Sequence, residues 1–330
     1  STQLRARFND GIERTLNAVE LEDFPGMYSV AAAADARILH DWIRMALIMG
    51  AIGAGTTAIL VFQVLGMMRR RLSLQGELER SLQRDEFEIN YQPVIELQSG
   101  RCAGAEALIS WVPPGEKRVR PDLFIPLAED TGLIEPMTEW LMRQIRVELG
   151  EWLGQDRSLH VAINLSAFHF ESDRVLETTR KIFENSDIQP AQIIYEITER
   201  GLIEEDNEMA REIMKQLRAR NSHMALDDFG TGYSSLSYIS SFPLDFLKID
   251  KSFVETIGTD AVMAGLVDSI IDMAQRLELR TIAEGVETRA QAEYLRERGV
   301  DYAQGWFYCR GVPAAEFIHF AETFDSSSNG

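Results

Sequence analysis

Two adjacent carboxylates stand where an apolar run of this chain ends and a glycine turn begins. The run Met224–Leu226 is followed by Asp227 and Asp228, and then by Gly230 and Gly232. Two carboxylates this close repel each other and lose hydration, and a divalent cation relieves both effects. An isolated Asp-Asp pair before a turn is more often a solvated turn, so the prediction of a metal site depends on the other polar residues of the chain.

Other apolar runs also contain polar residues at or near their carboxyl ends. These residues are Glu106, Asn164, Glu196 with Glu199, Lys248, Glu284 with Glu287, and Gln304. Alone, each has an ordinary explanation, such as a helix cap for Asn164 or an internal ion pair for Lys248. If they meet, several carboxylates surround one lysine, and such a group does not stay ionised without bound cations.

These ligands are oxygen atoms, and no cluster of histidine or cysteine accompanies them in the sequence. The set favours Mg²⁺ or Mn²⁺ over Zn²⁺. Two ions that share a carboxylate, beside a lysine, would suit hydrolysis of a phosphodiester, because one ion activates water and both stabilise the phosphoryl oxygens. The turn at Gly230 lacks the lysine of a Walker A loop, which disfavours phosphoryl transfer from ATP.

Short apolar runs alternate with helical patterns from residue 87 onward. The runs are 87–95, 103–110, 159–165, 192–198, 223–228, 244–250, 280–283 and 302–306, and the helices are 139–153, 173–183, 206–219, 261–277 and 289–298. This order predicts a TIM-like (β/α)8 barrel, in which the carboxyl ends of the strands meet at one face. The first two runs have no helix between them, which indicates an antiparallel first strand.

The composition limits the classes of partner. The chain has 330 residues, of which 45% are hydrophobic, and its Lys+Arg count of 33 against an Asp+Glu count of 52 gives a net charge of -19. Binding of DNA or RNA through basic patches is therefore not expected, and an anionic substrate would need metal ions. Cys102 and Cys309 offer no disulfide framework.

One segment is predicted to cross a membrane. Residues 45–68 contain no charged side chain and exceed the roughly 20 residues that span a bilayer. Arg69, Arg70 and Arg71 follow directly, so the positive-inside rule places the rest of the chain in the cytoplasm. Small residues at Ala51 and Gly55 would allow the helix to dimerise.

The domain boundaries follow from these patterns. Residues 1–44, with Leu4, Leu16 and Val19 at helical spacing, are predicted to be a helical remnant outside the cytoplasm. A transmembrane helix at 45–68, a linker helix at 69–85, the barrel at 86–322 and a disordered tail at 323–330 are predicted to follow. The chain does not begin with methionine, which suggests a piece of a longer protein.

The motifs resemble those of the EAL family of cyclic di-GMP phosphodiesterases. They are EAL from Glu106, YQP from Tyr91, FIPLAEDTGLI from Phe124, NLS from Asn164, EITE from Glu196, DDFGTGYSSL from Asp227, LKID from Leu247, AEGVE from Ala283 and QGW from Gln304. The resemblance implies a TIM-like barrel with an antiparallel first strand and metal-dependent opening of cyclic di-GMP to linear pGpG. Together with the predicted transmembrane segment, it leads us to expect a protein of the bacterial inner membrane with its catalytic domain in the cytoplasm.

The resemblance also implies roles for single residues. The first metal ion would be held by Glu106, Asn164, Glu196 and Asp227. The second would be held by Asp227, Asp228 and, directly or through water, Glu284. Lys248 would orient or deprotonate the attacking water, with Glu284 and Glu199 as further catalytic residues, Glu199 by fixing the loop after the Asp pair. Substrate contacts and support would come from Gln92, Leu108, Gln304 and Glu287, and the 229–236 loop would take part in homodimer formation.

One position departs from the family pattern. The family has an arginine before the tryptophan of its extended signature, where it contacts the substrate phosphate region, whereas this chain has Ser110 before Trp111. Loss of a bidentate cation from an anion site weakens binding. We expect an active enzyme with reduced affinity, and the alternatives are a receptor that binds cyclic di-GMP without cleaving it or a membrane scaffold.

Overall fold

The computed structural model describes residues 2–7, 13–21, 24–115, 117–199, 201, 208–230, 239–258 and 264–324. The chain divides into two compact units, Ser1–Ser73 and Leu74–Gly330. The predicted tail lies outside the described residues beyond Phe324, and so does most of the predicted dimer loop, at 231–236.

The first unit begins with a three-stranded antiparallel sheet. Its strands are β1 Thr2–Arg7, β2 Glu13–Glu20 and β3 Tyr28–Ala34, in the order β1-β2-β3. The predicted helical segment at 1–44 is therefore wrong as far as Ala34. The residues Thr2–Arg7 alternate between polar and apolar from Gln3 onward, which is the pattern of a strand. The helical spacing of Leu4, Leu16 and Val19 joins residues of two different strands.

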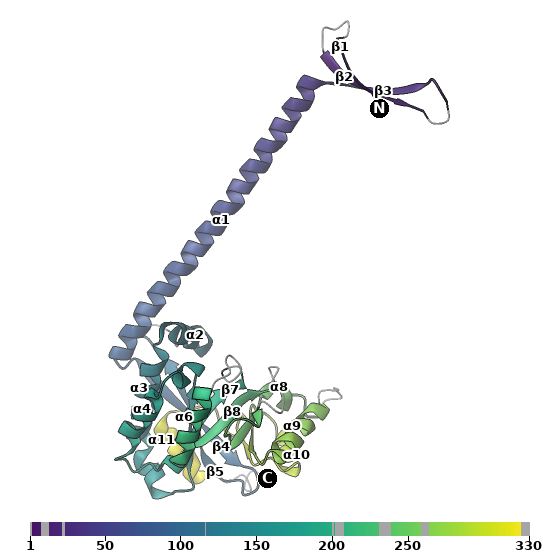
Figure 1. Cartoon of the computed structure of the whole chain (residues 1–330). Coiled ribbons are helices and arrows are strands. Elements are labelled where there is room, and N and C mark those ends of the chain that lie inside the picture. Colours follow the sequence, from purple (N-terminus) through teal and green to yellow (C-terminus); the bar gives the residue numbers. More distant parts are fainter. Residues whose placement is uncertain are drawn as a thin grey trace. The chain divides into compact units, whose positions relative to one another are not determined.

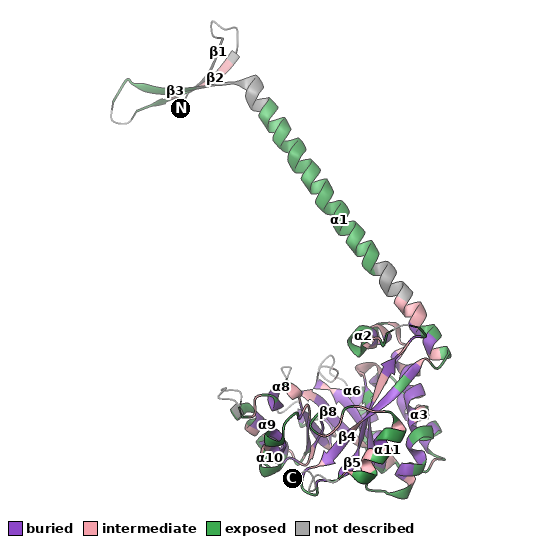
Figure 2. Cartoon of the chain, turned by 180° about the vertical axis from the view of Figure 1, so that it is seen from behind, coloured by how far each residue is buried: buried purple, intermediate pink, exposed green. Residues whose placement is uncertain are grey.

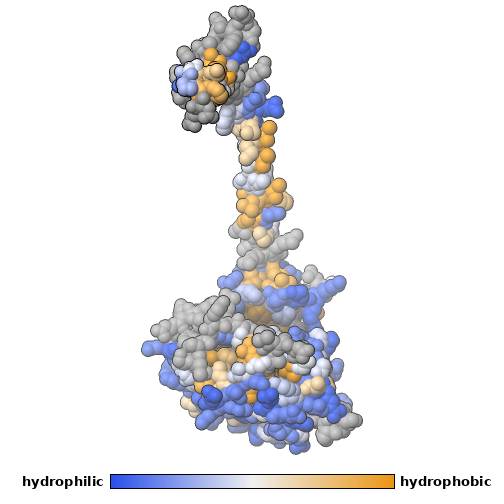
Figure 3. Space-filling model, turned by 90° about the vertical axis from the view of Figure 1, so that its right-hand side faces the viewer, coloured by the Kyte–Doolittle hydropathy of each residue, from blue (hydrophilic) through white to orange (hydrophobic). Residues whose placement is uncertain are grey.

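Helix α1 Asp35–Gln83 follows without a break, so the predicted linker helix is the continuation of the predicted transmembrane helix. Within α1, the segment His40–Met67 is sufficiently long and apolar to cross a membrane. The most apolar part of this segment is not buried against the rest of the protein. Figure 2 shows this part of α1 exposed along its length, and Figure 3 shows the hydrophobic side chains that it presents.

The second unit contains a closed barrel of eight strands surrounded by helices (Figure 1). The strands are β4 Phe87–Glu96, β5 Cys102–Trp111, β6 His160–Leu165, β7 Ile193–Thr198, β8 His223–Phe229, β9 Phe246–Ile249, β10 Arg280–Ala283 and β11 Tyr302–Ala303. β4 runs antiparallel to both β5 and β11, and the other neighbours are parallel. The barrel, its eight strands and the antiparallel first strand are thus confirmed.

The helices of this unit cover the outside of the barrel. They are α2 Pro121–Thr131, α3 Ile134–Gln155, η1 Ala167–Phe170, α4 Arg174–Phe183, η2 Pro190–Gln192, α6 Glu208–Ala219, α8 Lys251–Val254, α9 Ala264–Arg276, α10 Arg289–Glu297 and α11 Ala314–Thr323. The sequence did not predict α2, because Pro126 lies inside it and proline normally ends a helix. Its buried residues Phe124 and Ala128, four positions apart, form one apolar face toward the barrel.

The last turns of α1 belong to the second unit and pack on the barrel. Leu78 is fully buried in the same hydrophobic core as Phe87, Trp111 and Trp140. After the helix ends, Asp85 accepts a hydrogen bond of 2.9 Å from the Trp140 indole. The chain entering β4 is therefore fixed to α3 by both apolar contact and a hydrogen bond.

Candidate active site

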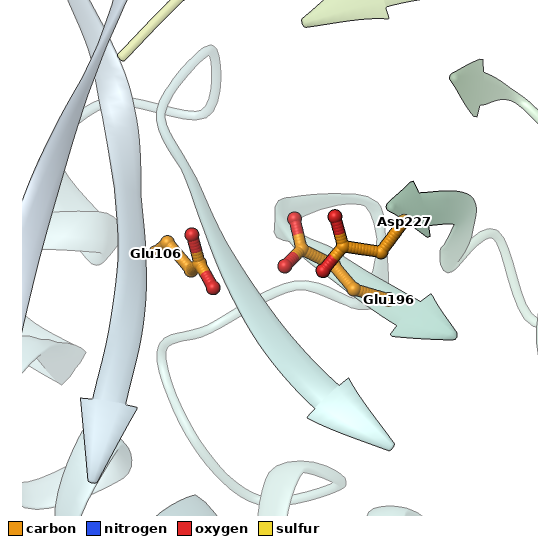
Figure 4. A group of neighbouring side chains, drawn as sticks. All are labelled: Glu106, Glu196 and Asp227. Carbon is orange, nitrogen blue, oxygen red and sulfur yellow. The ribbon is translucent and has the colours of Figure 1, made fainter. Parts of the chain in front are cut away.

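Four neighbouring strands of the barrel bring three of the predicted acidic residues and Asn164 together. Glu106 lies on β5, Asn164 on β6, Glu196 on β7 and Asp227 on β8. In the register of the barrel Asn164 pairs with Glu196, and Asp227 pairs with Thr198, two residues beyond Glu196. Figure 4 shows the Glu106, Glu196 and Asp227 side chains directed into one space inside the barrel.

Two overlapping groups of carboxylates form at this mouth. Glu106, Glu196 and Asp227 form one group, and Asp227, Asp228 and Glu284 form the other; within each group the ligand oxygens lie within 4.8 Å of one another. Asp227 belongs to both. The residues predicted as metal ligands are therefore adjacent in space, although they lie far apart in the chain.

Asp228 reaches this space because the strand breaks its regular geometry there. Its φ is +53°, in the left-handed region, and the pairing of β8 with β9 shifts register between Leu226 and Phe229. In a regular strand successive side chains point to opposite faces. The turn thus allows the adjacent residues Asp227 and Asp228 to serve one site, and the backbone NH of Asp228 donates to Asp227 Oδ1 at 2.9 Å.

Lys248 on β9 contacts four of these carboxylates. Its Nζ lies 2.7 Å from Glu196 Oε2, 2.7 Å from Glu284 Oε1, 3.2 Å from Asp227 Oδ1 and 3.5 Å from Glu106 Oε2. Burial alone would lower the pKa of Lys248, but the surrounding carboxylates outweigh burial and raise it well above its usual value. The lysine is therefore a buried ammonium at the centre of the cluster.

Two amide side chains complete the hydrogen bonding of Glu106. Gln304 Nε2 donates to Glu106 Oε2 at 2.7 Å and to Glu284 Oε1 at 3.0 Å. Asn164 Nδ2 donates to Glu106 Oε1 at 2.7 Å. Burial raises the pKa of Glu106, but the lysine and the two amides together lower it below its usual value.

For Glu196, Glu284 and Asp228, the surroundings disfavour the ionised carboxylate. Burial, followed by the neighbouring carboxylates, raises the pKa of Glu196 well above its usual value and that of Glu284 to about 8. Burial and the charges of Asp227 and Asp250 raise the pKa of Asp228. One lysine does not balance this many buried carboxylates, so the site has the charge and the oxygen donors that fit divalent cations such as Mg²⁺ or Mn²⁺.

Two other predicted residues lie outside the cluster. Glu199 Oε2 accepts a hydrogen bond of 3.1 Å from the backbone NH of Gly230, two residues after Asp228. Glu287 Oε1 lies 2.6 Å from Lys251 Nζ, with both side chains partly exposed. Glu287 therefore forms a surface ion pair in this structure, and the structure shows no contact of its carboxylate with the acidic cluster among the described residues.

A pocket of about 940 Å³ adjoins the cluster, and Asn164 lines it. Its walls come from β5, α2, α3 and η1, and the predicted substrate contact Leu108 is among them, together with Ser110. Gln92 faces Glu106 across the β4–β5 pairing. Sequence reasoning missed Arg118, which also lines the pocket, because it lies in an irregular segment without a strand or helix pattern.

Comparison with known proteins agrees with this architecture. The solved structure of the PaMucR phosphodiesterase in complex with c-di-GMP is 34% identical, has a TM-score of 0.70, and covers 74% of this chain and 99% of that chain. Two proteins of Escherichia coli (strain K12) match over longer stretches. The probable cyclic di-GMP phosphodiesterase PdeB is 35% identical over 323 residues, and the probable cyclic di-GMP phosphodiesterase PdeN is 31% identical over 318 residues.

These two matches cover 97% and 93% of this chain, but only 61% and 60% of the relatives' own length. The matches therefore include the N-terminal sheet and α1 as well as the barrel. Residues 75–311 match the family described as EAL domain. The barrel, the acidic residues on its strands and the family match all lead to the same conclusion. The chain belongs to the EAL domain family.

Proposed function

We propose that this protein hydrolyses cyclic di-GMP to linear pGpG with two Mg²⁺ or Mn²⁺ ions. The observation that supports this most directly is the pair of carboxylate groups that share Asp227 at the mouth of an EAL-family barrel. The PaMucR phosphodiesterase, whose sequence is 34% identical to this chain, has been solved in complex with c-di-GMP. Together these favour a phosphodiesterase whose substrate is the same cyclic dinucleotide.

The roles of the ligands follow from the two groups. Glu106, Asn164, Glu196 and Asp227 would hold one ion, and Asp227, Asp228 and Glu284 the other. Bound ions of this kind lower the pKa of a water ligand and offset the charge of the phosphoryl oxygens. Rotation of the Asn164 amide would present its oxygen in place of the nitrogen that now contacts Glu106.

Lys248 is placed to orient the attacking water. In the present arrangement it is an ammonium and can only donate hydrogen bonds. Cations on the same carboxylates would offset the negative charge that raises its pKa, and would bring it closer to acting as a base. Glu199 would hold the turn after Asp228 through Gly230, and Gln304 would hold Glu106 and Glu284 in place.

The pocket lined by Leu108 would receive the nucleotide beyond the scissile phosphate. Its lining includes the apolar side chains of Ile125, Pro126 and Met137, which suit contact with a purine base. Gln92 would assist from the adjacent strand. Glu287, which forms an ion pair with Lys251, would support substrate binding from outside the cluster.

The apolar part of α1 would anchor the protein in the bacterial inner membrane by one span, with the barrel in the cytoplasm. Support comes from the exposed stretch His40–Met67 and from the arginines that follow it. A homodimer through α1 and the 229–236 loop is part of the same proposal. Fractionation tests the anchor: the protein should pellet with membranes, resist carbonate washing and dissolve only in detergent, and recovery in the soluble fraction would contradict it.

The proposed activity is tested by chromatography of the nucleotides after incubation of the detergent-solubilised protein with cyclic di-GMP. We expect pGpG with Mg²⁺ or Mn²⁺ and none after chelation. Asp227→Asn should abolish turnover, and Asp272→Asn, at an exposed position of α9, is the matched control that should leave it unchanged. Tight binding with recovery of intact ligand would favour a receptor instead.

A further inference from the structure

Arg118 is the one basic residue among the described residues that line the pocket beside the acidic cluster. The same walls contain the acidic residues Glu129, Asp130 and Glu171. Ser110, also in the lining, is buried and accepts a hydrogen bond of 3.0 Å from Asn90 Nδ2. An anionic ligand in this pocket therefore meets more negative than positive side chains, which makes the position of Arg118 important.

We propose that Arg118 binds the phosphodiester group of the substrate that is not being hydrolysed, and so provides the positive charge that position 110 lacks. This inference rests on the proposed function. A cyclic dinucleotide has two phosphodiester groups, and only one of them can lie at the ions while it is opened. The second group extends into the pocket, where a guanidinium can bind two of its oxygens at once.

The pairing of the strands brings Arg118 close to position 110. Glu88 on β4 lies opposite Ser110 on β5, and Arg118 Nη2 lies 3.3 Å from Glu88 Oε2. The segment that contains Arg118 is fixed to β5, because the backbone NH of Val119 donates to the Trp111 carbonyl at 2.8 Å. Arg118 thus lies at the end of the β4–β5 hairpin where Ser110 also lies.

The present partner of Arg118 does not prevent this role. The Arg118 and Glu88 side chains are 55% and 59% exposed, and ion pairs between exposed side chains contribute little to stability. The guanidinium can therefore exchange Glu88 for a phosphate at small cost. Arg120, two residues further on, instead pairs with Asp122 and is not among the described residues of the lining.

Steady-state kinetics of the detergent-solubilised full chain test the proposal. We expect Arg118→Ala to raise KM for cyclic di-GMP about 10- to 100-fold with kcat changed less than about twofold, because a charge-assisted contact made in both ground and transition states is lost. Arg118→Lys should give a smaller rise, since an ammonium does not bind two oxygens in a fixed fork. The dependence of KM on salt should weaken in Arg118→Ala.

Two control variants separate this role from general effects of charge. Arg180→Ala removes an arginine of similar exposure, 61%, that lies on α4 and pairs with Glu184 at 3.4 Å, and this variant should leave KM unchanged. Arg120→Ala tests the neighbouring cation and should also leave KM unchanged. An unchanged KM in Arg118→Ala, or an equal rise in Arg120→Ala, would overturn the proposal while the proposed activity stands.

The two proposals can fail separately. If the wild type binds cyclic di-GMP but does not cleave it, the proposed activity fails. The same variants are then compared by their Kd for cyclic di-GMP. A higher Kd in Arg118→Ala, a smaller rise in Arg118→Lys and no change in the control variants would support the role of Arg118. If the wild type neither binds nor cleaves the dinucleotide with either metal, both proposals are overturned.

Discussion

The Lys248 ammonium lies 2.7 Å from the Glu196 carboxylate, and both side chains are only 1% exposed. This pair is the most deeply buried contact of the acidic cluster, and Glu284, Asp227 and Glu106 surround the same nitrogen. The lysine offsets part of the repulsion between these acids when cations are absent. Its position therefore affects both the stability of the barrel and its response to metal ions.

Removal of this ammonium should make the fold depend on metal. Lys248→Met leaves several buried carboxylates without a compensating charge, which costs about 3–5 kcal/mol in the free energy of unfolding. Mg²⁺ or Mn²⁺ should recover much of that loss, so the melting temperature should rise more with metal in the variant than in the wild type. Lys251→Met, at a side chain 41% exposed, is the control. Equal metal responses in all three proteins would contradict the expectation.

The hydrogen bond from Gly230 to Glu199 should matter for turnover more than for stability. Glu199→Ala leaves the Gly230 NH without this acceptor and releases the turn that holds Asp228 at its φ of +53°. Loss of a residue that positions metal ligands typically lowers metal affinity or activity by about 10- to 100-fold. Glu199→Gln keeps an acceptor oxygen and should retain more activity in a titration with metal. Equal activities of the two variants would exclude this positioning role.

The buried His160 should weaken the fold in mild acid. Burial, with smaller effects of Arg280 and His223, lowers its pKa to about 4 from an ordinary 6.5. Below pH 6.5 the unfolded chain binds a proton that the folded chain excludes, so the stability associated with neutral His160 is lost as pH falls, at about 1.4 kcal/mol per pH unit down to pH 4.

His160→Phe isolates this effect from other groups that titrate in the same range. The ring lies 5.8 Å from Tyr302, and phenylalanine preserves that aromatic contact. The free energy of unfolding of the wild type relative to this variant should therefore fall as the pH is lowered from 6.5 to 4, when both are measured by urea denaturation. A constant difference across that range would show that His160 does not titrate this way.

The bond between Asp85 and Trp140 should stabilise the junction of α1 with the barrel. Asp85 has a φ of +53° and accepts from the Trp140 indole at 2.9 Å. Asp85→Ala removes the acceptor and places a less suitable residue in the left-handed region, at a cost of about 1–2 kcal/mol. Asp85→Asn keeps both properties and is the control. Hydrogen exchange should show faster opening at the end of α1 only in Asp85→Ala.

The sequence by itself predicted the barrel because its signals are local. Apolar runs of about ten residues or fewer mark each strand of the barrel, and all eight strands lie where these runs predict them, whereas α2 and α11 were not among the predicted helices. Glu106, Asn164, Glu196 and Asp227 were identified because polar residues interrupt strands that are otherwise buried. The N-terminal sheet is not apparent from the sequence, because the apolar residues of its separate strands also fall at helical spacing.

The tertiary structure decided which of these residues meet. Closure of the barrel and its register bring Lys248 within contact of Glu106, which lies more than a hundred residues earlier in the chain, whereas they leave Glu287 paired with Lys251. The pocket and the place of Arg118 in it also depend on how the β4–β5 hairpin, α2 and α3 pack. Periodicity reports only the face on which a side chain lies, and contacts between distant strands follow from the folded chain.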